Sequence, residues 1–124
     1  MIFVDTASVA APVRAAAEAM AAFVAVDLEL EPCALLWYDA APGVRGVYIS
    51  IGGAVPAISL NVRRSPRQVA RTVAHELRHR WQDRAGRLVG LAGPALEKDA
   101  RRYAAGALRR CMVAGSGATV YATI

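Results

Sequence analysis

The sequence predicts a small α+β domain that occupies the whole chain, residues 1–124, with a three-stranded or four-stranded sheet and three helices. Three observations favour this class. Hydrophobic residues make up 56% of the chain, which is enough to pack one core. Three short apolar stretches follow one another between residues 33 and 62. Patterns with helical periodicity lie before and after them.

The first half of the chain is expected to form one helix and the three strands. Alanine alternates with larger apolar residues over 9–27, and Pro12 suits the first turn of this N-terminal helix. The stretches 33–39, 44–51 and 57–62 have the length and the β-branched or aromatic content of strands.

The second expected helix runs from Pro66 to about Arg84 and has the clearest boundaries. Ser65 suits the N-cap, proline suits the first helical position, and Gln68 completes a capping box. Gly86 is expected to end the helix.

A C-terminal helix is expected over about 95–113. Its apolar positions recur with helical spacing, and the segment before it contains glycine and proline. Residues 119–121 would add the fourth strand if the tail joins the sheet.

The second helix carries the most informative motif, His75-Glu76-Leu77-Arg78-His79. Residues four apart lie one above the other on a helix, so both imidazoles can reach one metal ion. Glu76 lies beside them, where a general base would act on a water molecule. Both histidines of the chain belong to this motif. The motif predicts a catalytic zinc site, which needs a third protein ligand and an open position.

Glu97 is the expected third ligand. Asp83 lies about 12 Å of helix rise beyond His75, too far for bonds of about 2 Å. In the C-terminal helix, Glu97 lies beside the apolar stripe, whereas Asp99 is expected to face solvent. The alternative is that Glu97 pairs with Arg101, four residues later.

These two segments together resemble a known family. H-E-x-x-H at 75–79, followed by Glu97-Lys98-Asp99-Ala100-Arg101-Arg102-Tyr103-Ala104, is similar to the minigluzincins, small zinc metallopeptidases that include the ImmA/IrrE-type domains. The resemblance covers about half of the chain, from Val47 to Ala107. It implies Zn²⁺ as cofactor, His75, His79 and Glu97 as its ligands, and Glu76 as catalytic base.

The resemblance also implies a substrate and a place for it. A protein or peptide in extended conformation would lie along an edge strand, for which Ile58, Ser59, Leu60 and Asn61 are the candidates. In larger relatives an aspartate four residues after the glutamate supports a ligand histidine, and here that position is arginine. Thr72, Asp83, Asp99 or a backbone carbonyl is the candidate support. Tyr103 is expected in the core, although it or an arginine is a candidate donor to the oxyanion.

Other interpretations stay open at this stage. The chain could be a zinc-binding regulatory or interaction protein with little turnover, or the histidines could be ordinary helix residues. The net charge of +5 raises nucleic acid as a partner, but no aromatic and basic interleaving supports it. Cys33 and Cys111 are too far apart for a C-x-x-C unit and are expected as buried thiols. Residues 9–26 contain charges and lack a basic leader, so a cytoplasmic protein without a membrane span is expected.

Overall fold

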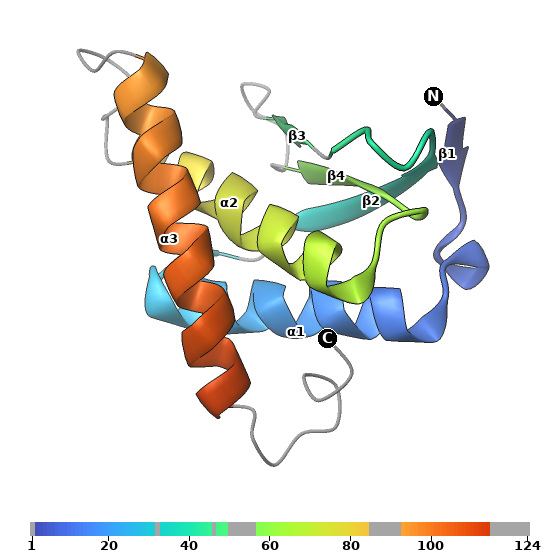
Figure 1. Ribbon diagram of the computed structural model, residues 1–124, viewed down its shortest axis with the longest axis horizontal. Coiled ribbons are helices and arrows are strands. Elements are labelled where there is room, and N and C mark those ends of the chain that lie inside the picture. Colours follow the sequence, from blue (N-terminus) through green and yellow to red (C-terminus); the bar gives the residue numbers. More distant parts are fainter. Residues whose placement is uncertain (1, 32, 46, 50–56, 85–92, 115–124) are drawn as a thin grey trace.

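A computed structural model describes residues 2–31, 33–45, 47–49, 57–84 and 93–114. It is an α+β fold in which one sheet lies against α2, and α2 in turn packs against α1 and α3 (Figure 1). The strands are β1 (Ile2–Val4), β2 (Ala34–Asp39), β3 (Val47–Ile49) and β4 (Ala57–Asn61). The helices are α1 (Ala11–Asp27), α2 (Pro66–Arg84) and α3 (Gly93–Ala114), and a short 3₁₀ helix, η1 (Thr6–Ser8), precedes α1.

The set of strands expected for the sheet is wrong. The sequence predicts a sheet built from three strands that all follow the first helix, with a fourth from the tail. The chain instead begins with β1, which pairs antiparallel with β2, and the sheet order is β1-β2-β4-β3. Its centre is the parallel pair β2 and β4. Residues 119–121 lie outside the described part of the chain.

β4 lies inside the sheet, and this matters for the site. It pairs with β2 on one side and with β3 on the other. Both of its hydrogen-bonding edges are therefore occupied, and β3 is the edge strand on the α2 side. Residues 58–61 are also buried, with exposed fractions of 3% or less.

α2 begins where the capping signals predict. The Ser65 hydroxyl accepts from the Gln68 backbone N–H at 3.2 Å, and the Gln68 side-chain oxygen accepts from the Ser65 N–H at 3.0 Å. This reciprocal capping box satisfies two N–H groups that a helix start otherwise leaves without partners. The first turn of α2 is thus fixed locally.

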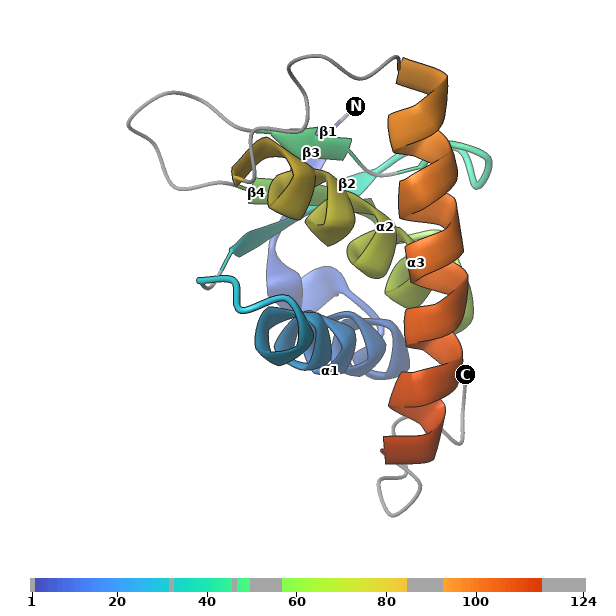
Figure 2. The ribbon, with the colours of Figure 1, turned by 90° about the vertical axis from the view of Figure 1, so that its left-hand side faces the viewer.

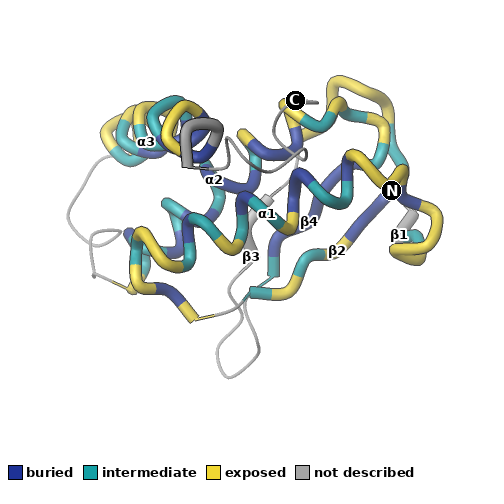
Figure 3. The backbone as a smooth tube through the Cα atoms, turned by 90° about the horizontal axis from the view of Figure 1, so that it is seen from below, coloured by how far each residue is buried: buried dark blue, intermediate teal, exposed yellow. Residues whose placement is uncertain are grey.

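α2 is the central helix of the fold. It packs against α1, α3, β3 and β4, and Figure 2 shows it between the sheet and the other two helices. Burial alternates along α1 and α3, as expected of helices with one face against the core (Figure 3). The core at these contacts is built largely from alanine and valine, namely Val13, Ala16, Ala17, Val69, Ala70, Val73, Ala74, Ala104 and Ala107.

Small side chains let helix backbones approach closely, so α2 is held between its neighbours. No helix in the described part of the chain combines the length and the apolar character needed to cross a bilayer. Cys33 and Cys111 are not joined in a disulfide.

Candidate metal centre

α2 places the two histidines on one side of the helix, one turn apart. The ring centroids of His75 and His79 are 4.8 Å apart, and the two Nε2 atoms are separated by 3.2 Å. The side chains are only 20% and 16% exposed. This arrangement follows directly from the spacing of four residues in the motif.

α3 brings a carboxylate to the same point. The Glu97 Oε1 atom lies 2.8 Å from His79 Nε2, and Oε2 lies 3.2 Å from His75 Nε2. The structure thus brings together the three residues that the sequence predicts as metal ligands. Within the described ranges, they form the one group of three His, Cys, Asp or Glu residues with ligand atoms close enough to share an ion.

The distances between these side chains suit a small cation. A tetrahedral zinc ion with bonds of about 2.0–2.1 Å has ligand atoms about 3.3 Å apart. The two Nε2 atoms lie 3.2 Å apart, each lies 2.8–3.2 Å from a different Glu97 oxygen, and one ligand atom from each of the three residues lies within 4.8 Å of the others. Two imidazole nitrogens and a carboxylate are also the donor set found in catalytic zinc sites.

Gln82 fixes the orientation of His79. Its Oε1 atom lies 2.7 Å from His79 Nδ1. The amide nitrogen donates to the Leu96 carbonyl at 3.0 Å and to Asp99 Oδ2 at 2.9 Å, which sets the direction of the amide. The Gln82 oxygen thus accepts from His79 Nδ1, which leaves Nε2, on the side of Glu97, as the ring nitrogen available to a metal ion.

Asp99 contacts α2 although 43% of its side chain is exposed, so the expectation that it faces solvent is only partly right. It accepts from Gln82 and from Arg78, whose Nε lies 2.8 Å from Oδ2. Arg78 is also not solvated as its position on the helix suggests, because it stacks over Trp81 at 3.8 Å and is 18% exposed. Asp99 thus supports His79 indirectly, because it binds Gln82 and Gln82 contacts the imidazole.

Sequence reasoning missed Gln82 as a supporting residue. A signal was present, because it lies three residues after His79 and therefore on a neighbouring part of the helix surface. Its partners Leu96 and Asp99 belong to another helix, so local spacing alone could not select it over Thr72 or Asp83.

Two imidazole nitrogens and one carboxylate face one another in this site. Burial, and next the neighbouring His79, lower the pKa of His75 below its usual value, so its neutral form is favoured near pH 7. Both Nε2 atoms face the Glu97 carboxylate at 2.8–3.2 Å, so a cation bound between them would be held by all three side chains. The arrangement is therefore chemically suited to a divalent metal ion.

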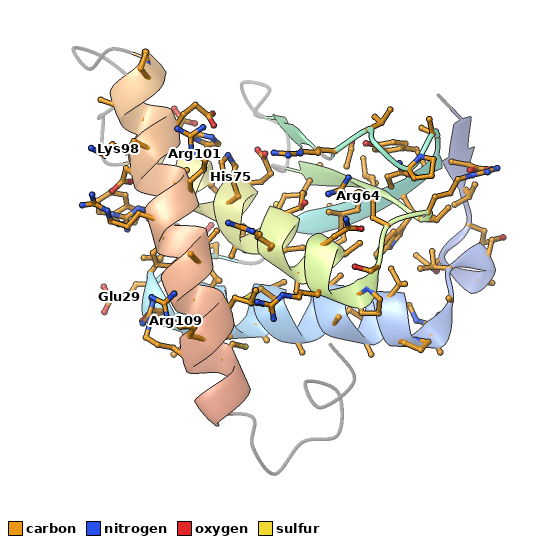
Figure 4. All side chains as sticks on the ribbon, viewed as in Figure 1. Glu29, Arg64, His75, Lys98, Arg101 and Arg109 are labelled. Atoms are coloured by element: carbon orange, nitrogen blue, oxygen red, sulfur yellow. The ribbon has the colours of Figure 1, made fainter. Side chains whose placement is uncertain are left out.

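The site opens into a cavity of about 590 Å³. Glu76, His75 and Glu97 all line it, so the expected base and two of the three expected ligands share one solvent-accessible space, while His79 is not among the lining residues. The other lining residues are Arg45, Arg64, Gln68, Arg71, Thr72 and Arg101. Figure 4 shows Arg101 and His75 close to each other where α3 passes α2.

Tyr103 is not available as an oxyanion donor in this conformation. Its hydroxyl donates to Asp27 Oδ2 at 2.7 Å, and the side chain is partly buried against the core, as expected. Arg101 does line the cavity, so an arginine remains the better candidate for that role.

The expected substrate strand is contradicted by the strand order. Ile58, Ser59, Leu60 and Asn61 form β4, whose two edges already pair with β2 and β3. A substrate cannot add to an interior strand. β3 is the edge strand that contacts α2, and among the described residues no strand pairs with its other edge, so strand addition is expected there.

Comparison with known proteins adds no relative: no family model, curated protein or solved structure matches the chain.

Proposed function

We propose that the protein is a zinc-dependent metallopeptidase, with His75, His79 and Glu97 as ligands and Glu76 as general base. The observation that carries this proposal is the convergence of two Nε2 atoms and one carboxylate within 2.8–3.2 Å, at the wall of a cavity. Three protein ligands leave a fourth position of a tetrahedral ion open, as catalytic zinc sites require.

The bound ion would supply Lewis-acid chemistry, lowering the pKa of water and polarising the substrate carbonyl. The protein residues have separate tasks. A Glu76 carboxylate oxygen accepts a proton from the attacking water and later returns it to the leaving amine nitrogen. Gln82 holds His79 in the tautomer that offers its Nε2 lone pair. The substrate backbone pairs with the open edge of β3.

The presence of Glu76 favours an enzyme over a structural zinc protein. A structural site closes its four positions with protein ligands and has no use for a base in an adjoining cavity. We also propose that the protein acts in the cytoplasm, where a reducing environment keeps Cys33 and Cys111 as thiols.

Glu76→Gln tests the catalytic assignment. The variant should retain wild-type zinc content, because Glu76 is not a ligand, and should lose peptide hydrolysis by at least 100-fold, within the range for general-base catalysis. Zinc content by atomic absorption and cleavage of a denatured protein substrate are the two measurements. Glu18→Gln, an exposed residue on α1, is the matched control and should behave as wild type.

Two results would contradict the proposal. A fully active Glu76→Gln variant would remove Glu76 as the base. Stoichiometric zinc with no hydrolysis in the wild type would instead identify a zinc-binding regulatory protein of the same fold.

A further inference from the structure

The cavity beside the metal centre is lined by four arginines. Arg45 precedes β3, Arg64 precedes α2, Arg71 lies on α2, and Arg101 lies on α3. They come from three parts of the fold, so the cluster is a product of tertiary structure and not of one basic segment. Figure 4 shows Arg64 and Arg101 on the same side of the molecule as His75.

None of these four arginines forms an ion pair within the described part of the chain. Elsewhere, Arg63, Arg78 and Arg110 each pair with an aspartate. Arg64 donates to the Pro42 carbonyl at 2.9 Å, but its buried Nε atom has no hydrogen-bond partner among the described residues. The cavity thus holds guanidinium groups with unused donors.

The carboxylates of the cavity are fewer than its guanidinium groups. Among the described residues, Glu76 and Glu97 line it against four arginines, and the proposed function assigns one glutamate as base and the other as metal ligand. A bound divalent cation would add further positive charge. Guanidinium groups match carboxylates with two parallel hydrogen bonds, so an anionic ligand is the natural occupant.

The spacing along α2 indicates where the anions lie. Arg71 is four residues before His75, about 6 Å along the helix. Arg64 lies two residues before α2 begins at Pro66 and lines the same cavity. An extended peptide advances about 3.3 Å per residue, so a peptide on β3, which contacts α2, meets Arg71 roughly two residues from the bond above the metal centre.

We propose that the substrate is an acidic peptide segment whose carboxylates bind Arg71 and Arg64 in this cavity. This inference rests on the proposed peptidase function and specifies its substrate class. Arg45 and Arg101 complete the positive wall of the cavity. A nucleic acid fits less well, since no aromatic side chain lines the cavity among the described residues and bases would have no stacking platform.

A binding measurement tests this inference independently of catalysis. The zinc-loaded Glu76→Gln protein is titrated with fluorescein-labelled, alanine-rich twelve-residue peptides that carry two glutamates, or glutamines at the same positions. Fluorescence anisotropy should give at least tenfold tighter binding for the acidic peptide, weakening as salt rises. Equal affinity for the two peptides would overturn the inference.

Variants of the arginines test whether the preference for the acidic peptide arises in the cavity. Arg71→Gln and Arg64→Gln should each reduce the preference for the acidic peptide several-fold. Arg71→Glu, at an exposed helix position, should shift the preference toward a lysine-containing peptide. Arg109→Gln removes an exposed arginine farther along α3 and should leave the preference unchanged (Figure 4). Loss of preference in Arg109→Gln to the same extent as in Arg71→Gln would overturn the inference.

Wild-type cleavage of the same peptides distinguishes the two proposals. Acidic binding without hydrolysis supports the binding surface and refutes the peptidase. Hydrolysis of both peptides at equal rates supports the peptidase and refutes the acidic preference. Tighter, arginine-dependent binding of a single-stranded oligonucleotide than of the acidic peptide would also refute the inference and favour a nucleic-acid ligand.

Discussion

Gln82 connects the metal centre to the packing between α2 and α3. Its amide accepts from His79 and donates to Leu96 and Asp99, so it fixes both the tautomer and the direction of one ligand. Gln82→Met keeps a similar volume but removes these hydrogen bonds. We expect the zinc dissociation constant to rise about 10–100-fold, as for other residues that support a ligand. Isothermal titration calorimetry measures this change.

Glu18→Gln provides the control, because Glu18 is exposed and lies on α1. Its zinc affinity should equal the wild-type value. Unchanged affinity in Gln82→Met would show that Gln82 does not support the ligand.

At the residue scale, the sequence predicted the ligand atoms better than the residues around them. His75 and His79 lie on one helix, and the i, i+4 rule is local. Glu97 was selected because it lies beside the apolar stripe, but its side chain is 48% exposed and that of Asp99 is 43% exposed, so burial does not separate the two carboxylates. The contacts of Asp99 were not predicted, because only the packing of α3 against α2 reveals that Gln82 and Arg78 lie opposite it.

At the element scale, α1 and α3 are joined by a polar contact at their ends. Arg110 Nη1 and Nη2 donate to the two Asp27 oxygens at 2.9 and 3.0 Å, and the Tyr103 hydroxyl donates to the same carboxylate. The Arg110 hydrogen bonds lower the pKa of Asp27 below its usual value, and the Tyr103 hydrogen bond adds to this effect. Partial burial opposes them but is the weaker influence.

This contact predicts a pH dependence of stability. The folded-state pKa of Asp27 is depressed, so its stabilisation is present above the unfolded pKa and is lost as pH falls below about 4. Asp27→Asn should cost about 1 kcal/mol at pH 7, a small figure because the pair is partly exposed.

Urea denaturation of wild type and Asp27→Asn at pH 7 and pH 3 measures the difference in the free energy of unfolding. The difference should shrink toward zero near pH 3, and Glu18→Gln on α1 should change little at either pH. A constant difference between pH 7 and pH 3 would contradict the assignment.

The elements themselves were predictable where local signals were strong. α2 spans Pro66–Arg84 as the capping box and the apolar spacing predict. β1 was missed because three residues are too short to show alternation, and pairing with β2 defines it. The edge strand was misassigned because strand order depends on which strands pair, and these pairs can be far apart in sequence. β4 pairs with β2 as well as with β3, so β3 is at the edge of the sheet.

At the scale of the whole molecule, the metal centre lies between two helices that also pack against each other through the core. The buried residues of α2 and α3 are apolar apart from Arg80 and Gln82. The fold should therefore persist without metal, while the ion should stabilise it by binding only the folded state.

Removal of zinc with EDTA should leave the helical circular dichroism at 20 °C unchanged and abolish peptide hydrolysis. The melting temperature should fall by roughly 10 °C relative to protein in zinc at 100 times its dissociation constant, from about 2.7 kcal/mol of binding free energy. Adding zinc back should restore both properties. Unfolding on chelation would instead indicate a structural metal site, and hydrolysis in EDTA would exclude a metallopeptidase.

The most direct test of the central claim is the zinc content of the purified wild type and of Glu97→Ala, with Glu18→Ala as control. Two imidazoles from α2 and a carboxylate from α3 should hold about one zinc ion per wild-type chain, and the control should match it. Glu97→Ala should lose most of this zinc after dialysis. Full zinc retention in Glu97→Ala, or a wild type that binds no divalent metal, would contradict the account.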